Sequence, residues 1–530
     1  MVFSLAACSS KDAASSDSTE EQEKWLELGG TEDIGNLTAH TTGSLTAQAW
    51  VIDALVDFRN GEAIPALAER WEISEDGTVY TFHIRPNVKF SNGEDFDANV
   101  AKQNLDMAVK HKDENTWMAL LAHIVSIEAT DDATLVIKLD QTYYPALQEL
   151  ASYCPVRMLA PSAFPDGGDP FEEPCKEPIG IGPWVLLEHK DGEYAKFARN
   201  EYYWGDMPEI DGFTLHIIPD GETMAANLES GELDMIYDNY TSSSFNTASF
   251  LSFVDKEGFD TAISEEPTMV RQIVMYSGHE NLQDIRVRQA LIYGLDRDEI
   301  GETVYQGLEY PATGNQYGLF TKNMAYCDVE YDNVYDYDQD LANQLLDEAG
   351  WKMNDATGIR EKDGKSLVIT YVYDGSDPDK VTQAQLMQSM YKEIGVDLQM
   401  DQTDASTLWT YRLDGTYDMI DYISWGFPYD PHSTMEALNP EDSQIFALSR
   451  RGVSEEEQTA LYELFHTAIV EPDEAARTEI YRQVFNQWND EAVVIPMSNM
   501  TNKAAFRTGI SGVTFNGAYD MPLSTITMDD

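Results

Sequence analysis

The chain has 530 residues, of which 42% are apolar and 11% aromatic, and 94 acidic against 34 basic residues give it a formal net charge of −60. Such a length exceeds one compact core, so we expect two large lobes. The sequence contains no Lys/Arg-rich stretch that could neutralise phosphates, which excludes nucleic acid and anionic membrane surfaces as expected partners. The acidic surplus is typical of a solvated surface.

The N-terminal segment contains the run "LAAC" (Leu5–Cys8), followed by a small-residue and acidic tract up to Lys24. This arrangement resembles the processing site of bacterial lipoproteins, in which Cys8 would carry the lipid and the tract would be a flexible tether. Only seven residues precede the cysteine, without a basic region or a full apolar region. We therefore expect the printed start to be trimmed or misassigned, and a chance cysteine in a disordered tail is the alternative. No later apolar run is long enough to span a bilayer.

Mixed strand and helix patterns follow from Trp25 to about Pro267. Apolar and polar side chains alternate over 79–90, which predicts a half-buried strand, and the alternation returns over 133–140. Residues 97–110 between them have the spacing of an amphipathic helix.

From about Thr268 the pattern becomes helix, glycine, strand. Helices are predicted over 284–300, over 339–350 with Gly350 as the stop, and over 382–395 with Gly395 leading directly into a strand. Such joins favour an α/β lobe. A long helical stretch over 455–488 then precedes an apolar strand over 492–497, which we expect to return toward the first lobe.

The stretch "SWGFPYDPHS" (424–433) collects four rings within ten residues. Its two prolines argue against a helix, so backbone pairing cannot position these rings. They either fill a gap beneath a lobe or line a site.

Three cysteines remain after Cys8: Cys154, Cys175 and Cys327. The absence of a C-x-x-C pair excludes a zinc ribbon and a thioredoxin-type motif. A Cys154–Cys175 disulfide is an open alternative in an oxidising compartment, because spacing alone cannot decide it.

Catalytic templates are absent from the sequence. There is no G-x-S-x-G, no H-E-x-x-H and no G-x-x-x-x-G-K-[ST] motif. The paired glycines of "GIGPW" precede a proline and a predicted strand, which indicates a turn rather than a phosphate loop. Carboxylate pairs carry little information in so acidic a chain, so we expect a protein that is not an enzyme.

Several longer stretches are more specific than these motifs. In chain order they are "LAERWEISEDGTVYTFHIRPNVKFSNGEDFDANV", "APSAF", "PIGIGPWVL", "RNEYYWG", "ESGELDM", "DIRVRQALIYGLDR" and "WGFPYDPHS". Their order and spacing resemble those of the extracytoplasmic solute-binding proteins of peptide and nickel ABC importers, bacterial family 5. The resemblance covers about 25–521, and "KFSNGEDFDA", "YYPALQELA" and "WGFPYDPH" look most like the nickel-binding branch.

The resemblance implies an α/β, two-lobed periplasmic-binding-protein fold of type II, a Venus flytrap with a small extra subdomain in lobe one. We expect a signal remnant and tether over 1–24, lobe one over 25–267 with the subdomain at about 61–178, lobe two over 268–496, and a return to lobe one over 497–530. A ligand between the lobes would be buried by their closure.

The resemblance also implies ligand-binding residues. The branch lines its cleft with rings that match Trp425, Tyr429 and Trp117 here, and it has a tyrosine where Trp409 stands. Its lobe-one contacts fall on "HTTGSL", where this chain offers His40, Thr41 and Leu45.

The charged residues of the branch are not retained. Cys154 and Glu114 stand where the branch uses arginines to grip the carboxylates of the metal's chelator. Ser443 stands where a branch histidine can reach nickel. We expect Arg157 to take over part of the carboxylate grip.

Two histidines are the expected metal ligands, His40 and His432, because both fall in segments of the cleft and nickel favours imidazole. For His432 the alternative is a structural hydrogen bond that holds the proline-rich loop, and for His40 the alternative is plain packing. A small chelator would have to supply most ligands.

We therefore expect a lipid-anchored, monomeric receptor on the outer face of the bacterial membrane or in the periplasm, which delivers a nickel chelate or metallophore complex to the permease subunits of an ABC importer. Nickel would be cargo, and we expect no resident cofactor. A protein that binds short peptides for a peptide importer is the alternative, and a secreted hydrolase is a remote one.

Overall fold

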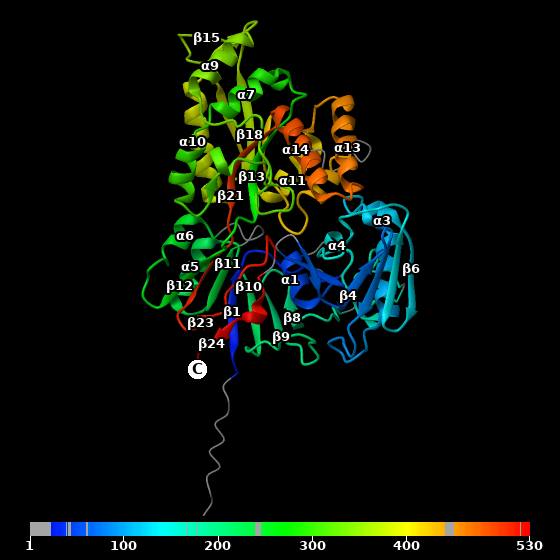
Figure 1. The fold of residues 1–530 in the computed structure, drawn as a ribbon. Coiled ribbons are helices and arrows are strands. Elements are labelled where there is room, and N and C mark those ends of the chain that lie inside the picture. The colour runs from blue at the N-terminus through cyan, green and yellow to red at the C-terminus, as the bar shows by residue number, and fades with distance from the viewer. Residues whose placement is uncertain are drawn as a thin grey trace, which may run out of the picture.

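The computed structural model describes residues 23–35, 37–38, 40, 44–59, 62–166, 168–175, 177–238, 245–439, 450–519 and 521–529. They form two α/β lobes, one below the other in Figure 1, with a smaller antiparallel sheet beside the lower lobe. The expected two-lobed fold class is therefore confirmed. Cys8, Thr41 and Ser443 lie outside the described residues.

Lobe one contains a seven-stranded mixed sheet. In spatial order its strands are β12 (Phe259–Ile263), β22 (Lys503–Arg507), β11 (Met235–Asp238), β1 (Trp25–Gly30), β10 (Gly212–Ile217), β9 (Tyr194–Arg199) and β8 (Trp184–Lys190). The first strand, β1, pairs in parallel with both β10 and β11, whereas β22 near the C-terminus is antiparallel to both of its neighbours. The helices of this lobe are α1 (Leu45–Val51), α5 (Gly221–Ser230) and α6 (Thr247–Leu251).

The smaller sheet has four antiparallel strands in the order β4 (Ala68–Ile73), β5 (Val79–Ile84), β7 (Thr134–Leu139) and β6 (Ile124–Asp131). The predicted alternation is confirmed over Val79–Ile84, because Tyr80, Phe82 and Ile84 of β5 are buried and their neighbours are less so. The strand ends at Ile84 rather than at residue 90, because the chain turns at Pro86 and Asn87, where Asn87 has φ +60°. The predicted helix is α2 (Ala98–Lys110), which Asp97 caps by accepting hydrogen bonds from two backbone amides. It packs on β6 and β7.

Short elements connect this sheet to lobe one. They are β2 (Val56–Arg59), β3 (Glu62–Pro65), η1 (Lys112–Glu114), α3 (Leu120–His123), α4 (Ala146–Glu149) and η2 (Pro161–Ala163). The short helix α4 lies on the side that faces lobe two in Figure 1, and it packs against the hairpin of β2 and β3.

Lobe two contains a six-stranded sheet in the order β14 (Tyr310–Pro311), β21 (Val494–Met500), β13 (Met269–Met275), β20 (Met419–Ile423), β18 (Val368–Asp374) and β19 (Asp397–Thr403). Its helices are α7 (Ile285–Tyr293), α8 (Arg297–Ile300), η4 (Gly301–Tyr305), α9 (Gln339–Glu348), α10 (Pro378–Glu393), α11 (Ala405–Asp414), α12 (His432–Glu436), α13 (Glu455–Ile469) and α14 (Glu474–Asp490). Minor elements of lobe two are η3 (Glu280–Leu282), η5 (Gly314–Gln316), β15 (Lys352–Met353), β16 (Arg360–Lys362) and β17 (Lys365–Ser366). After the return to lobe one the chain forms β23 (Ile510–Ser511), η7 (Leu523–Thr525) and β24 (Thr527–Met528).

Most helices predicted in this lobe are present, with two refinements. The helix predicted over 284–300 ends at Tyr293 and resumes as α8, and the long stretch over 455–488 is the antiparallel pair α13 and α14. Gly350 and Gly395 follow α9 and α10 with φ of +90° and +78°, the left-handed conformation that ends a helix.

The chain crosses between the lobes twice. The first crossing lies between the end of β12 and the start of β13, and the second between β21 and β22. Because β21 remains paired with β13 as far as Met500, the return falls after that residue rather than near Pro496. We call the region of these two crossings the hinge.

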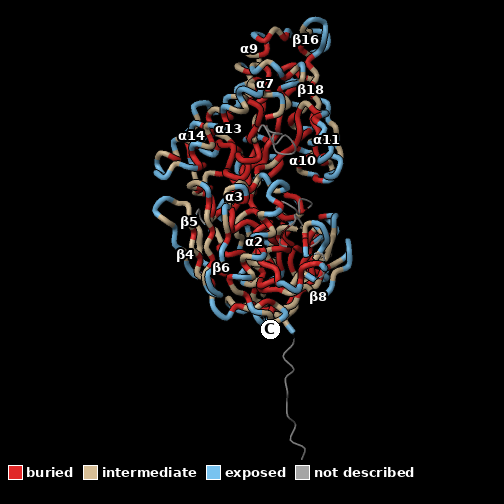
Figure 2. The backbone as a smooth tube through the Cα atoms, turned by 90° about the vertical axis from the view of Figure 1, so that its right-hand side faces the viewer, coloured by how far each residue is buried: buried red, intermediate tan, exposed pale blue. Residues whose placement is uncertain are grey.

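Buried residues fill the interior of both lobes in Figure 2. One apolar cluster belongs to lobe two alone, whereas another extends from lobe one and the small sheet into α13 and α14, through Leu461, Phe465, Tyr481 and Phe485. The two lobes therefore share buried apolar surface beside the small sheet.

Cys154, Cys175 and Cys327 are thiols in this structure. The Cys175 thiol donates a hydrogen bond to the Leu37 carbonyl oxygen at 3.2 Å, and Cys154 is buried. The open alternative of a Cys154–Cys175 disulfide is therefore not realised. Among the described residues, no helix has both the length and the apolar character that crossing a bilayer requires.

Candidate functional site

A cluster of five rings lies where the lobes meet, and we call it the ring cluster: Trp117, Tyr153, Trp425, Tyr429 and Tyr519. Trp117, Tyr153 and Tyr519 come from lobe one, the last from the C-terminal return. Trp425 and Tyr429 come from the loop after β20 of lobe two. The cluster is therefore shared between the lobes.

The rings meet edge to face. The centroid of Trp117 lies 6.2 Å from that of Trp425 and 5.5 Å from that of Tyr429, with interplanar angles of 84° and 71°. Tyr429 in turn lies 5.7 Å from Tyr519. Tyr429 is only 5% exposed, whereas both indoles are half-buried. The indoles are thus the members of the cluster that retain surface for a ligand.

The proline-rich loop is held by its own carboxylate. The Asp430 carboxylate accepts hydrogen bonds from the Gly426 amide and the Thr434 hydroxyl. Burial raises the pKa of Asp430 to about 6. Gly426 has φ +75°, and a Cβ there would lie 2.7 Å from both Ala518 and the Thr268 carbonyl oxygen, so only glycine fits. The loop is non-helical through Pro431, and α12 begins at His432.

Contacts from lobe one reinforce the loop. Gln148 donates hydrogen bonds to the carbonyl oxygens of Pro428 and Asp430, at 2.6 and 3.3 Å. The Tyr519 hydroxyl donates to the Trp425 carbonyl oxygen. These contacts fix the positions of Trp425 and Tyr429 by side chains rather than by strand pairing.

His432 lies in a different group, which we call the polar network: Tyr143, Glu149, His432 and Glu436. The His432 Nε2 atom is 2.7 Å from the Tyr143 hydroxyl and 2.9 Å from a Glu149 carboxylate oxygen, and the imidazole is 1% exposed. The enclosed imidazole leaves no open space in which a metal ion could bind it, contrary to its expected role as a metal ligand. The structural hydrogen bond, the other interpretation of His432, is present.

The rest of the network is equally enclosed. The other Glu149 oxygen accepts a hydrogen bond from the Leu120 amide at 2.9 Å, and Glu436 accepts one from the Tyr462 hydroxyl at 2.8 Å. Although burial raises the pKa of Glu436, His466 and His432 lower it overall. Because Glu149 belongs to lobe one and His432 to lobe two, the network joins the lobes.

His40 is not part of the ring cluster. It is fully buried, with its ring centroid 5.6 Å from that of Phe164 and 5.8 Å from that of Phe171. Burial lowers the pKa of His40 to about 4. The structure thus gives the packed alternative for this residue.

Arg157 lies directly behind the ring cluster. Its guanidinium is 4.6 Å from the centroid of Tyr153, and it donates hydrogen bonds to the carbonyl oxygens of Ile52 and Ser152. Two of its guanidinium nitrogens already bind backbone carbonyl oxygens, and only 9% of the residue is exposed. Arg157 is therefore poorly placed for the expected bidentate contact with a carboxylate of the ligand. Glu114 is exposed and pairs with His111 at 2.9 Å.

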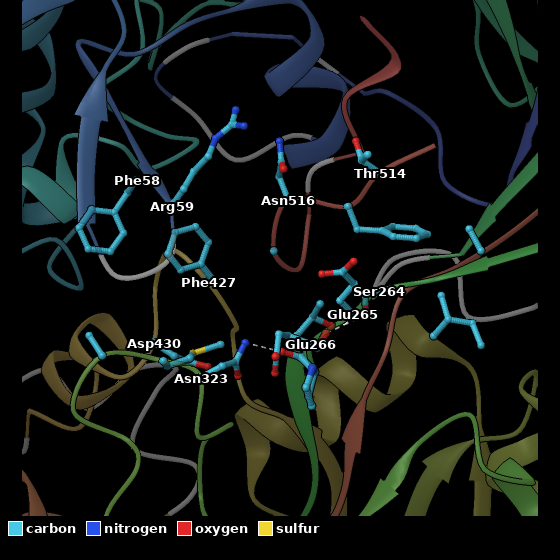
Figure 3. A pocket seen from close by; sticks show the side chains of 18 of the residues that line it. Phe58, Arg59, Ser264, Glu265, Glu266, Asn323, Phe427, Asp430, Thr514 and Asn516 are labelled. Atoms are coloured by element: carbon cyan, nitrogen blue, oxygen red, sulfur yellow. Dashed lines mark hydrogen bonds between the residues drawn. The ribbon is translucent and has the colours of Figure 1, made fainter. Parts of the chain in front are cut away.

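Two spaces flank the ring cluster. The first, of about 730 Å³, is the hinge pocket shown in Figure 3, where Phe58 stacks on Phe427 with centroids 5.5 Å apart. Asn323 and Asp430 of lobe two and Asn516 of lobe one point toward the same hollow, beside the crossing segment with Glu265. The hinge pocket therefore adjoins the outer side of the proline-rich loop.

The second space, of about 310 Å³, also lies between the lobes, and we call it the acidic chamber. Trp409 forms part of its wall and is 42% exposed. Ile423 and Met500 line the chamber and also pack against the ring cluster, so the two are adjacent. Trp409 thus contributes to a neighbouring space and not to the cluster itself.

Some residues of the site were not predicted. Tyr153 and Tyr519 complete the ring cluster, and Phe58 stacks in the hinge pocket. Tyr153 precedes Cys154, the position where the nickel-binding branch has an arginine, so the sequence already pointed to this segment. Nothing in the sequence relates Tyr519 to the loop near Trp425.

Metal-ligand geometry is absent from the ring cluster. Within the part of the chain that the structure describes, one group of three His, Cys, Asp or Glu side chains has ligand atoms within 4.8 Å of one another: Asp33, His189 and Asp191. None of these residues lines either interlobe space. A metal held at the rings would have to bring its own ligands.

Two α/β lobes joined by a double crossing, with rings from both lobes meeting between them, define a two-lobed solute-binding protein. Residues 62–444 match the bacterial extracellular solute-binding proteins, family 5. The chain belongs to this family.

Individual members and relatives of this family are similar to the chain over most of its length. The chain is 30% identical over 517 residues to the nickel-binding periplasmic protein of Escherichia coli K12, which covers 97% of this chain and 95% of that protein. The crystal structure of NikA from Brucella suis in complex with Fe(III)-EDTA matches with a TM-score of 0.89 and 32% identity, over 96% of this chain and 100% of that one. A putative ABC transporter peptide-binding protein of Brucella ovis is 27% identical over 466 residues, 84% of this chain and 81% of that protein.

Proposed function

We propose that this ABC-importer solute-binding protein captures a nickel chelate between its lobes and presents it to the permease subunits, without catalysing a reaction. The observation that carries the proposal is the ring cluster. In it, the ring centroid of Trp117 of lobe one lies within 6.2 Å of the ring centroids of Trp425 and Tyr429 of lobe two. A ligand that touches both indoles has a binding free energy that depends on the angle between the lobes, so binding favours closure.

The chemistry of the site supports a chelate over a bare ion. The described rings offer apolar faces and no set of metal ligands, while a chelate presents a flat or apolar outer surface to them. The nickel-binding relative of Escherichia coli and the Fe(III)-EDTA complex of the Brucella suis protein support the same cargo class.

A short peptide is the second candidate, supported by the Brucella ovis relative. Peptides are held by backbone hydrogen bonds and a charge for each terminus, which demands polar groups along the ligand. The ring cluster supplies few of these, so we rank the peptide below the chelate.

Thermal melting distinguishes the two cargoes. Nickel with an excess of L-histidine should raise the melting temperature by roughly 5 °C at a hundredfold excess over Kd, because a ligand that binds only the folded state stabilises it. Nickel alone and di- to pentapeptides should give smaller shifts. A shift with peptides and none with nickel plus histidine would remove the nickel proposal, and turnover of ester or glycoside substrates would remove the receptor role.

We extend the proposal to the location of the protein: a monomer, tethered outside the cytoplasmic membrane by lipid on Cys8. The "LAAC" sequence supports the anchor. Labelling of the expressed protein with radioactive palmitate should be lost in Cys8→Ser, and unchanged labelling would contradict the anchor.

A further inference from the structure

The acidic chamber contains more negative than positive side chains. Its lining includes six carboxylates and four cationic side chains. Glu309 is neutralised by Arg271 through two hydrogen bonds of 2.7 and 3.2 Å, and Lys503 lies 3.0 Å from Asp238. Lys380 instead pairs with Asp421, outside the lining, at 2.7 Å. The fourth cation, Arg412, donates a hydrogen bond to the Asp421 carbonyl oxygen at 2.6 Å.

Three carboxylates at the end of β18 and the start of α10 have no described cationic side chain within ion-pair distance. No ion pair within 4.0 Å joins Asp374, Asp377 or Asp379 to a described Lys, Arg or His side chain. Asp374 and Asp377 are buried, and their hydrogen bonds come from neighbouring residues of the same turn. Burial raises the pKa of Asp377, and the nearby charges of Lys380 and Arg271 lower it only in part, so the ionised form lacks full compensation.

A second, independent observation comes from the opposite lobe. Asp238 lines the chamber at the end of β11 and is 7% exposed. Only one of its oxygens faces Lys503, and the other, Oδ1, is buried without a hydrogen-bond partner. Burial raises the pKa of Asp238 to about 7, against the pull of Lys503. An unsatisfied buried carboxylate oxygen of this kind costs stability unless a donor reaches it.

From this geometry we infer that the acidic chamber receives a cationic arm, an ammonium group, of the chelate that the ring cluster holds. The inference rests on the proposed function and names the class of chelate, one with a positively charged substituent. Ile423 and Met500 line the chamber and also pack against the ring cluster, so the two places are adjacent and a chelate at the rings lies within a short arm's length of the chamber.

An ammonium group in the chamber would favour closure. Asp238 of lobe one and the carboxylates of lobe two face the same space, so their charges repel each other as the lobes approach. An ammonium between them replaces this repulsion with charge-assisted hydrogen bonds. The exposed face of Trp409 in the same wall can add a cation–π contact.

The test compares two nickel chelates that differ at one group. The Ni(II) complexes of L-lysine and L-norleucine bind metal through the same amino acid atoms, but lysine ends in an ammonium and norleucine in a methyl. For the unaltered protein we expect the lysine chelate to bind about tenfold more tightly in calorimetric titrations, the size of one charge-assisted hydrogen bond.

The variants assign this preference to the chamber. Asp374→Asn combined with Asp377→Asn should reduce the preference to twofold or less and leave the norleucine chelate unaffected. Asparagine at 377 still caps α10. Asp238→Asn alone is the second variant, with the same expectation. Asp414→Asn, exposed at the end of α11 and outside the chamber lining, is the matched control and should keep the tenfold preference.

The outcomes separate the inference from the function on which it rests. Equal affinity of both chelates for the unaltered protein, or a preference that survives in both variants, would overturn the ammonium chamber alone. If neither chelate binds and nickel with L-histidine does not bind either, the proposed function falls, and the inference falls with it.

Discussion

The ring cluster and the polar network both join the lobes, and the proline-rich loop with the helix α12 that follows it contributes to both. Trp425 and Tyr429 lie in the ring cluster, while His432 and Glu436, a few residues later, lie in the network. The network is 1–3% exposed at His432, Glu149 and Glu436. Tyr143, Glu149 and the His432 Nε2 atom bind one another, whereas His432 Nδ1 and one Glu436 oxygen are buried without a hydrogen-bond partner among the described residues. The indoles of the ring cluster keep open surface. The polar network therefore stabilises the contact between the lobes, whereas the ring cluster keeps surface for a ligand.

The largest expected effect is on the polar network. Glu149→Ala removes the acceptor of the Leu120 amide and the Tyr143 hydroxyl and the partner of His432, leaving buried groups unsatisfied. We expect a loss of about 3 to 5 kcal/mol in the free energy of unfolding, measured by urea denaturation without ligand.

An exposed carboxylate provides the control for this variant. Glu128 pairs with Lys138 at the protein surface, and Glu128→Gln should leave the urea midpoint unchanged. If Glu149→Ala were equally silent, the network would not stabilise the contact between the lobes.

Asp430 connects the two regions and gives a pH-dependent test. Because burial raises its pKa in the folded protein from 3.8 to about 6, the unfolded chain loses this proton at lower pH than the folded protein does. The group therefore destabilises the fold increasingly as the pH rises from about 4 to 6. Asp430→Asn should gain about 3 kcal/mol relative to the unaltered protein between pH 4 and pH 7.

Urea denaturation at a series of pH values measures this difference. The side-chain carbonyl oxygen of the asparagine can still accept the hydrogen bond from the Gly426 amide. A difference between the two proteins that does not change with pH would contradict a buried, ionised Asp430.

Trp425→Ala tests the ring cluster directly. The indole is half-buried, so we expect a loss of about 1 kcal/mol in stability and at least a tenfold loss of affinity for nickel with L-histidine in calorimetric titrations. Trp71→Ala is the matched control, since Trp71 is a half-buried indole of β4 outside the ring cluster, and it should leave the affinity unchanged. A large fall in melting temperature of the ligand-free Trp425→Ala protein, with affinity retained, would assign this indole to the core.

The smallest effect is expected at Trp409. With 42% of the residue exposed and a place in the acidic chamber, Trp409→Ala should change the melting temperature by less than about 2 °C. Affinity for nickel with L-histidine should fall no more than about threefold, measured in the same titrations. A loss as large as that of Trp425→Ala would place Trp409 among the rings that hold the cargo.

Local patterns predicted much of the fold. The alternation of Tyr80, Phe82 and Ile84 and the glycine stops at Gly350 and Gly395 depend on neighbours in the chain, and the structure has them. The break of the predicted 284–300 helix was missed because its apolar spacing continues through Gly294.

The site was predictable only in part. The proline-rich stretch marked Trp425 and Tyr429, and the family resemblance supplied Trp117, which the structure brings beside them. The partners of His432 lie elsewhere, since Tyr143 is 289 residues away in sequence, and no local pattern reports such a contact. The same holds for Tyr519, whose hydroxyl reaches the Trp425 carbonyl from the C-terminal return.

An anomalous-scattering map at the nickel edge, from crystals grown with nickel and L-histidine, tests the central claim most directly. We predict one strong peak between Trp117 and Trp425, with the histidine ligands of the chelate around it. A peak at Asp33, His189 and Asp191 with none beside the indoles would contradict capture between the lobes.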